Sequence, residues 1–216
     1  MSFGRRLLDI LFPPKCPFCG RVLQSGEELL CPDCVRDLPR TGEKTVKCDF
    51  IRAASAPFYY EGKVRDALLR YKFQGASARG AAFGRLIAED LIRREAVDFD
   101  VITWVPLSRK RERSRGYDQA RILAESVSKT LNIPAIPLLR KIRNVPAQSL
   151  QKTPEARRAN ISGCYEAADP QRIQGARILL VDDIITTGAT VSECARVLML
   201  AGAEDIRAAS VACHRE

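Results

Sequence analysis

Two adjacent carboxylates, Asp182 and Asp183, stand just before a turn of small residues, and this combination is the most specific chemical signal in the chain. The turn consists of five residues: Thr186, Thr187, Gly188, Ala189 and Thr190. A turn that opens a helix presents unpaired N–H groups and a partial positive charge, which suit a phosphate group. The two carboxylates would repel that phosphate, so we expect them to accept hydrogen bonds from ribose hydroxyls or to hold a divalent cation through its waters. A sugar phosphate with free hydroxyls satisfies both halves of the site.

The segments on either side of these residues predict the elements that position them. The apolar run over residues 176–181 predicts a buried parallel strand, and helical spacing over residues 190–201 predicts the helix that follows. An ordinary strand–turn–helix with a solvated acid pair is the alternative. We favour the phosphate site because strand, acids, small turn and helix occur in the order that such a site needs.

A second chemical signal is the basic stretch over residues 107–116, which follows a predicted core strand at residues 100–105. In open α/β sheets, ligands bind at the carboxyl ends of the strands, so this stretch and the turn should share one edge of the sheet. Its cations and amides would stabilise the charge on a leaving pyrophosphate. We predict a loop whose pyrophosphate-binding residues are Leu107, Ser108, Arg109 and Lys110. A solvated basic loop or a nucleic-acid patch is the alternative.

Four cysteines near the start form two Cys-x-x-Cys pairs: Cys16, Cys19, Cys31 and Cys34. Two such turns facing each other make a tetrahedral sulfur site, which suits a structural zinc ion with no open position for catalysis. Redox or disulfide pairs are the alternative. The other four cysteines are scattered singly, which indicates small buried hydrophobic residues. We predict two units: an amphipathic helix with a zinc ribbon at residues 1–48, joined through a linker after Leu38, and an α/β domain at residues 49–216.

Size and charge restrict the class of protein. The 216 residues can bury one sizeable core, and the formal net charge of +9 favours polyanionic partners such as nucleic acid or phosphorylated substrates. There is no apolar run long enough for a membrane span. Residues 1–12 lack a cleavage site and are interrupted by Asp9, so we expect a docked amphipathic helix and a cytoplasmic protein.

A long polar stretch over residues 139–162 resembles the loops that close over active sites. The candidate lid and substrate-contacting residues are Lys72, Arg115, Gln148, Arg157 and Asn160. For any one of them, an ordinary surface position is the alternative. His214 is the only histidine; because it lies near a terminus that we expect to be unanchored, we assign it no catalytic role.

Taken together, the chain resembles the ComF family of competence-associated, phosphoribosyltransferase-like proteins. The residues that carry the resemblance are 11–20, 60–62, 72–75, 105–108, 115–120, Gln148, Arg157 with Asn160, and 181–190. The resemblance implies an α/β fold of the type I phosphoribosyltransferase class, with a mainly parallel sheet flanked by helices and a small N-terminal zinc ribbon. It also implies Mg²⁺-dependent binding of phosphoribosyl pyrophosphate, with Asp182 and Asp183 on the ribose, and a part in DNA uptake.

Three positions depart from what such families usually carry. Many members of the family have further cysteine pairs after the first ribbon, whereas here only Cys48 follows, so we expect one zinc ion. Asp118 stands where the family usually has Asn. Thr186 stands where purine-salvage relatives have a carboxylate, which speaks against purine salvage.

Three functions stay open at this point. The first is an enzyme, or enzyme-like protein, that transfers the phosphoribosyl group, including the salvage of a nucleobase. The second is a non-catalytic module in which the basic groove holds single-stranded DNA while the ribbon docks a partner such as a competence helicase. The third is a sensor of phosphoribosyl pyrophosphate without turnover.

Overall fold

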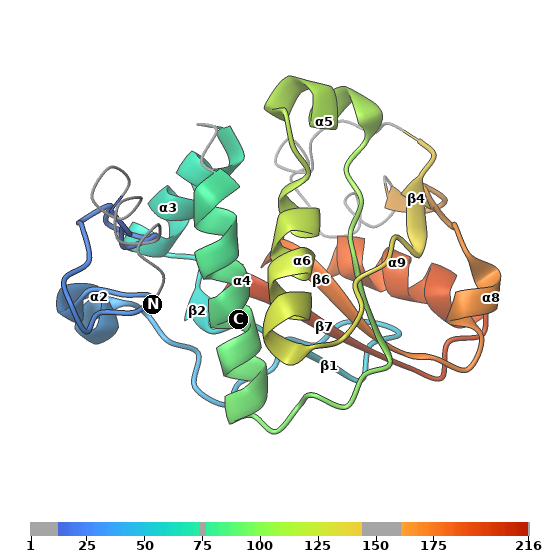
Figure 1. The fold of residues 1–216 in the computed structure, drawn as a ribbon. Helices are drawn as coiled ribbons and strands as arrows, with labels where there is room; N and C mark the ends of the chain where they lie inside the picture. The colour runs from blue at the N-terminus through green and yellow to red at the C-terminus, as the bar shows by residue number, and fades with distance from the viewer. Residues whose placement is uncertain (1–12, 74–76, 144–160, 216) are drawn as a thin grey trace.

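The computed structural model describes residues 13–73, 77–143 and 161–215, and its centre is a five-stranded parallel sheet (Figure 1). The strands are β1 (Ala53–Ser55), β2 (Phe58–Tyr59), β3 (Val101–Trp104), β6 (Arg177–Ile185) and β7 (Asp205–Cys213). The spatial order is β1-β7-β6-β3, and β2 pairs with β7 beyond the end of β1. Every pairing in this sheet is parallel, as the apolar runs predict.

The sheet is covered on both faces, and the alternation of side chains along β6 shows how. Leu179 and Val181 pack into one hydrophobic cluster, whereas Ile178 and Leu180 pack into the other. On the first face lie α3 (Gly62–Phe73), α4 (Ser77–Arg93) and α6 (Gln119–Leu131), and on the second lies α9 (Ala189–Leu200). Successive residues of a strand point to opposite faces, so a fully apolar strand requires cover on both sides.

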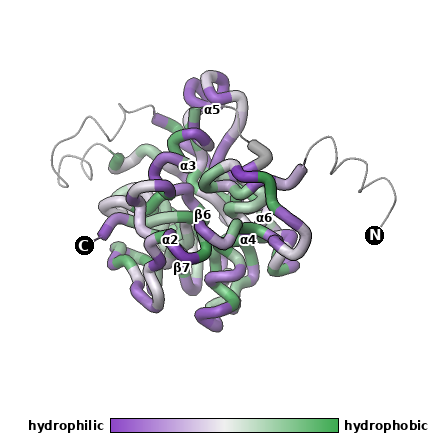
Figure 2. The backbone as a smooth tube through the Cα atoms, turned by 90° about the vertical axis from the view of Figure 1, so that its left-hand side faces the viewer, coloured by the Kyte–Doolittle hydropathy of each residue, from purple (hydrophilic) through white to green (hydrophobic). Residues whose placement is uncertain are grey.

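Shorter elements complete the architecture. They are α2 (Pro32–Asp37), α5 (Arg109–Arg115), β4 (Leu139–Lys141), β5 (Tyr165–Ala167) and α8 (Pro170–Ile173). β4 and β5 form a separate antiparallel pair. α5 stands above the carboxyl edge of the sheet, and its tube is largely hydrophilic where the strands are hydrophobic (Figures 1 and 2).

The zinc ribbon (residues 13–38) packs directly onto the first face of the sheet. Phe18 meets the rings of Phe58 and Phe83 edge-on, at centroid distances of 5.0 and 5.4 Å. A guanidinium nitrogen of Arg70 donates to the carbonyl oxygen of Phe18 at 2.6 Å. The ribbon therefore shares its core with the α/β region, and the division at residue 48 stays a prediction.

Several expectations about local structure were wrong. The stretch after Leu38 is not a free linker, because Arg40 and Val46 form bridges with Phe58 and Ala54. Most of the basic stretch is a helix, α5, rather than a loop; Ser108 caps it, and Arg111 and Arg115, four residues apart, are its half-buried positions. β6 continues through Asp182 and Asp183 to Ile185, because β7 pairs with it over that whole length. β5 and α8 were not predicted.

Two further expectations concern the ends of the chain. The predicted amphipathic helix at residues 1–12 lies outside the described residues. The C-terminus is anchored, contrary to expectation: His214 N–H donates to the Ile185 carbonyl at 3.1 Å, and Arg215 pairs with Glu61 at 2.9 Å. No helix among the described residues combines the length and the apolar character that a membrane crossing requires.

Candidate functional site

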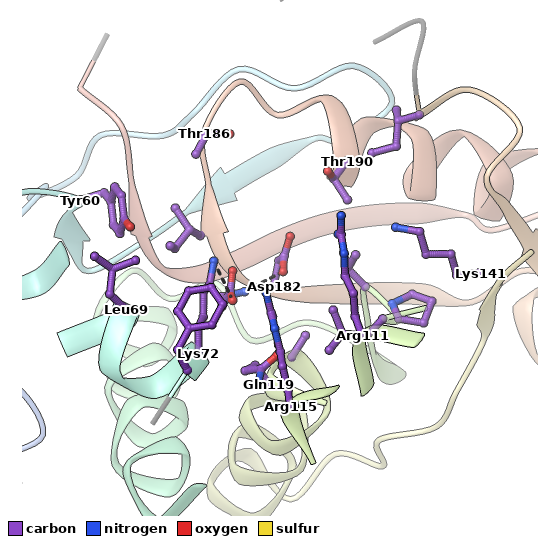
Figure 3. Close-up of a pocket in the computed structure, with 18 of the residues that line it drawn as sticks. Tyr60, Leu69, Lys72, Arg111, Arg115, Gln119, Lys141, Asp182, Thr186 and Thr190 are labelled. Carbon is purple, nitrogen blue, oxygen red and sulfur yellow. Dashed lines mark hydrogen bonds and ion pairs between the residues drawn. The ribbon is translucent and has the colours of Figure 1, made fainter. Parts of the chain in front are cut away.

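A cavity of about 800 Å³ opens at the carboxyl ends of β3 and β6, between α3 and α5 (Figure 3). Of the predicted site residues, seven line it: Lys72, Leu107, Arg115, Asp182, Asp183, Thr186 and Thr190. Thr187, Gly188 and Ala189 of the predicted turn do not line it. The seven lining residues come from four separate stretches of the chain. The parallel topology brings them together, because β3 and β6 are neighbours and both end at this edge.

The acid pair forms the floor of the cavity. Burial, followed by the charge of Asp183, raises the pKa of Asp182 to about 8. Asp182 accepts a hydrogen bond from the backbone N–H of Asp183 at 2.8 Å. Asp183 pairs with the ammonium of Lys72, which reaches in from the end of α3, at 3.0 Å. Two carboxylates held side by side cost stability, so this arrangement calls for a ligand that uses their charge.

The turn after β6 packs closely against the segment that contains Cys48. Gly188 has a φ of 72° and forms the N-cap of α9, a conformation that favours glycine. A Cβ at this position would lie 2.7 Å from the Sγ of Cys48, so the turn has no room for a side chain. The Oγ1 of Thr187 is buried and has no hydrogen-bond partner among the described residues. An unsatisfied buried hydroxyl costs about 1–3 kcal/mol, and a phosphate oxygen at this turn would satisfy it.

α5 divides its cations between two faces. Arg111 and Arg115 are half-buried and line the cavity, whereas Arg109, Lys110 and Arg113 are exposed. Of the four predicted pyrophosphate-binding residues, only Leu107 lines the cavity. The structure does not bring Arg109 and Lys110 into the site, because helical spacing turns them outward. Ser108 is buried, and its hydroxyl accepts from the N–H of Arg111 at 3.4 Å, which caps the helix.

Asp118 holds the base of this wall. Its carboxylate accepts hydrogen bonds from the N–H of Leu107 at 3.1 Å and from the N–H of Arg121 at 3.2 Å. The second bond caps α6, and the first ties α6 to the segment that follows β3. Burial raises the pKa of Asp118, although these two backbone donors act against it. The Leu107 N–H is thus engaged by a side chain of the protein. The sequence left the partners of Asp118 uncertain, and in the structure these partners are backbone groups of the protein itself.

Lys141 and Gln119 belong to the site and were not predicted. The ammonium of Lys141 lies 3.1 Å from the hydroxyl of Tyr165 and 4.9 Å from the centre of its ring. Burial and the positive charge of Arg111 lower the pKa of Lys141. Gln119 accepts from Arg115 at 2.8 Å, while its buried Nε2 has no partner among the described residues. Cations that repel each other and a donor without an acceptor both suit an anionic ligand.

The sequence carried a usable signal for only some of these residues. Helical spacing over residues 109–115 would have selected Arg111 and Arg115 as one face of a helix, had α5 been recognised. Lys141 lies on a strand of three residues, where no pattern marks it. His214, which we excluded, lines the cavity together with Tyr60. Gln148, Arg157 and Asn160 of the predicted lid lie outside the described residues.

The four paired cysteines form a second site, separate from the cavity. Their sulfur atoms lie within 4.8 Å of one another, and three of the four side chains are buried. Burial acts to raise the pKa of Cys16, but backbone N–H groups at Cys19, Cys31 and Phe18 hold it at about 7. Four sulfur ligands with one easily ionised thiol fit a structural zinc ion.

Comparisons with known proteins find two family models and several relatives. A family model described as a double zinc ribbon domain matches residues 7–50, and one described as a phosphoribosyl transferase domain matches residues 118–216. The competence protein ComFC of Bacillus subtilis (strain 168) is 30% identical over 196 residues, which cover 91% of this chain and 74% of that protein. The competence protein F of Haemophilus influenzae is 27% identical over 200 residues, covering 90% and 82%.

Among solved structures, the glutamine phosphoribosylpyrophosphate amidotransferase of B. subtilis, complexed with ADP and GMP, is similar to part of the chain. The match has a TM-score of 0.42 and 26% sequence identity, and it covers 61% of this chain and 25% of the amidotransferase chain.

Proposed function

The chain belongs to the ComF family of competence proteins and has a phosphoribosyltransferase fold with an N-terminal zinc ribbon; from this premise, we propose that it binds phosphoribosyl pyrophosphate with Mg²⁺ in the cavity and serves DNA uptake. The observation that carries the proposal is the convergence of three features on one cavity. These are the acid pair, Thr186 and Thr190 at the two ends of the turn, and the inward cations of α5.

Each part of the ligand has a matching part of the cavity. The 5′-phosphate would bind at the turn, where helix N–H groups and the Thr187 hydroxyl can donate. The ribose hydroxyls would donate to Asp182 and Asp183. The diphosphate would lie toward Arg111, Arg115 and Lys141, which line the cavity and can donate to its oxygens.

If the protein turns the ligand over, its residues act through position and charge. The cations of α5 and β4 stabilise the negative charge that the departing diphosphate gains, and the acid pair fixes the ribose beneath the bond that breaks. Mg²⁺, when bound, would further neutralise the diphosphate oxygens. None of the roles proposed here for the described residues requires a covalent intermediate with the protein.

The test is calorimetric titration of phosphoribosyl pyrophosphate with Mg²⁺ into the wild type and a double Asp182→Asn, Asp183→Asn variant. At pH 9, where Asp182 is ionised, we expect the variant to lose about a hundredfold or more in affinity, because two charge-assisted interactions disappear. The matched control is the double Asp98→Asn, Asp100→Asn variant, which removes the same charge at the far end of β3, where both acids pair with Arg177. Equal affinity in wild type and the Asp182/Asp183 variant would refute the proposal.

A second function, the binding of single-stranded DNA, is supported by the outer face of α5. Arg109, Lys110 and Arg113 are exposed there, beside the cavity mouth. Phosphate contacts of this kind make affinity fall steeply with salt. A triple Arg109→Gln, Lys110→Gln, Arg113→Gln variant should lose DNA affinity and salt dependence while it keeps its affinity for phosphoribosyl pyrophosphate. Unchanged DNA binding in this variant would exclude the α5 surface.

A further inference from the structure

The last turn of α3 contacts both the zinc ribbon and the cavity. It carries Arg70 and Lys72, which point in nearly opposite directions because two steps along an α-helix rotate a side chain by about 200°. A guanidinium nitrogen of Arg70 donates to the carbonyl oxygen of Phe18, in the ribbon, at 2.6 Å. The ammonium of Lys72 pairs with Asp183, in the cavity, at 3.0 Å (Figure 3). One helical turn is therefore held between the two sites.

Phe18 is the residue through which the state of the ribbon reaches this turn. It lies between Cys16 and Cys19, two of the four cysteines whose sulfur atoms lie within 4.8 Å of one another. A zinc ion that binds both sulfur atoms closes the short segment between them and fixes its peptide groups. One of these groups is the carbonyl that accepts from Arg70. If the segment opens, the acceptor of Arg70 moves with it.

A row of packed aromatic rings forms a second connection between the two sites. Phe18 meets Phe83 with ring centroids 5.4 Å apart, and Phe83 meets Tyr71 at 5.5 Å. Tyr71 belongs to the last turn of α3 and is buried, and its hydroxyl donates at 2.9 Å to the carbonyl of Gln119, which lines the cavity. Close-packed rings transmit a displacement instead of absorbing it. Movement of Phe18 therefore reaches α3 through packing as well as through the hydrogen bond.

The position of Lys72 determines how the acid pair meets an anionic ligand. Its ammonium offsets one of the negative charges that Asp182 and Asp183 can carry, beside the place where a phosphorylated ribose would bind. The interaction of two charges weakens with distance, and binding groups must be held within about 0.5 Å of their working geometry. A shift of the last turn of α3 would leave the carboxylates to repel the phosphate groups of the ligand.

We infer that the zinc ribbon and the cavity are energetically coupled through the last turn of α3, with Arg70 as a positioning residue that acts through Lys72. Zinc in the ribbon strengthens the binding of phosphoribosyl pyrophosphate, and that ligand strengthens the binding of zinc. The inference rests on the proposed binding of phosphoribosyl pyrophosphate. Coupling between two binding equilibria is reciprocal, so both directions are measurable.

The first experiment titrates phosphoribosyl pyrophosphate with Mg²⁺ into full-length wild type, Arg70→Met, Arg70→Lys, Lys72→Met and the double Arg70→Met, Lys72→Met variant. We expect Arg70→Met to bind the ligand at least about fivefold more weakly. Arg70→Lys, which keeps a donor for the Phe18 carbonyl, should recover most of the affinity. In the Lys72→Met background, Arg70→Met should change the affinity less than about twofold, whereas a general structural defect would add its own loss.

The matched control is Arg85→Met. Arg85 also pairs with the ribbon, at 3.4 Å from Glu28, but it lies on α4. We expect this variant to bind phosphoribosyl pyrophosphate as the wild type does. Elemental analysis should find zinc in all of these proteins, so that weaker binding by Arg70→Met does not reflect a lost ribbon.

The second experiment measures the reverse direction. Wild type and Lys72→Met are equilibrated with a chelator that prefers zinc to magnesium, with and without phosphoribosyl pyrophosphate and Mg²⁺, and the zinc that the protein retains is measured. We expect the ligand to raise the zinc affinity of the wild type about fivefold or more. In Lys72→Met this difference should disappear.

Three results would overturn the inference: wild-type affinity in Arg70→Met, additive losses from Arg70→Met and Lys72→Met, or a zinc affinity that ignores the ligand. A wild type that does not bind phosphoribosyl pyrophosphate would overturn the proposed function, and the coupling with it. The wild-type titration distinguishes that case from a protein that binds the ligand without coupling.

Discussion

The zinc ribbon and the cavity are both clusters of ionisable side chains, but they are built in opposite ways. In the ribbon, four thiols face one another, three of them buried, and Phe18 locks the cluster onto the sheet. In the cavity, two carboxylates lie together, Arg111 lowers the pKa of Lys141, and Thr187 and Gln119 each leave a buried polar atom unsatisfied among the described residues.

The two sites differ in what satisfies their ionisable and polar groups. A single metal ion satisfies all four thiols of the ribbon, so the cluster contributes to folding and leaves no position for a substrate. The cavity keeps two adjacent carboxyl groups and two buried polar atoms without a partner among the described residues, which is typical of a functional site. We therefore expect the ribbon to contribute stability and the cavity to bind a ligand. The predictions below separate the two roles.

The largest effect should come from the ribbon. Cys34→Ser removes one buried zinc ligand, and structural zinc in such sites is worth about 10–16 kcal/mol of binding free energy, comparable to the whole stability of a domain. We expect loss of bound zinc and a melting temperature lowered by more than about 10 °C, measured by elemental analysis and calorimetry. The control is Cys164→Ala, which changes a buried cysteine outside the cluster and should retain the zinc. A Cys34→Ser protein that melts like wild type would contradict a structural role.

The next effect concerns the two faces of α5. Arg111→Gln should weaken the binding of phosphoribosyl pyrophosphate about tenfold to a hundredfold, because a charge-assisted hydrogen bond contributes about 1.5–3 kcal/mol. Arg109→Gln makes the same change on the exposed face and should leave the affinity within about twofold. Titration calorimetry on both variants gives the comparison. If Arg109→Gln is the weaker binder, the placement of the pyrophosphate toward Arg111 is wrong.

A smaller effect should follow pH. Because burial and Asp183 raise the pKa of Asp182 to about 8, this carboxyl holds a proton at pH 7 and must release it to bind Mg²⁺ or accept from ribose. Affinity for the Mg²⁺ complex of phosphoribosyl pyrophosphate should rise about tenfold from pH 7 to pH 9. Asp182→Asn should flatten this dependence. Without ligand, the raised pKa of Asp182 also affects the free energy of unfolding. Its contribution is fully present below about pH 4 and is lost as the pH rises to about 8.

The smallest effect should come from Asp118, which supports the cavity without lining it. Asp118→Asn keeps one oxygen that can accept from a backbone N–H, but its NH2 group would face the other donor, so one of the two hydrogen bonds to Leu107 and Arg121 is lost. We expect the free energy of unfolding to fall by about 1 kcal/mol near pH 4. The fall should be smaller at pH 8, because the raised pKa of Asp118 makes the wild type lose part of its own stability as the pH rises. Denaturant titrations at the two pH values measure this, and a larger fall at pH 8 than at pH 4 would show that the ionised carboxylate is required.

Features that depend on consecutive residues were predictable from the sequence. The parallel strand before Asp182, the turn at residues 186–190 and the four ribbon cysteines are local patterns, and the structure has all three. The topology that places Lys72 against Asp183 needed the family resemblance, because the two residues lie on separate elements.

Features that depend on the direction of a side chain in a short element were not predictable. α5 has only seven residues and most of them are basic, so its sequence contains no apolar stripe that would show which arginines face the protein. Lys141 becomes a site residue only because β4 pairs with β5 beside the cavity. His214 was excluded because nothing in the sequence shows that β7 runs to Cys213 and carries the next residue against Tyr60.

The most direct test of the central claim is a crystal structure of the protein soaked with phosphoribosyl pyrophosphate and Mg²⁺. The account predicts the 5′-phosphate at the turn of residues 186–190, the ribose hydroxyls on Asp182 and Asp183, and the diphosphate beside Arg111 and Lys141. A ligand bound on the outer face of α5, or a cavity without ligand at a saturating concentration, would contradict it.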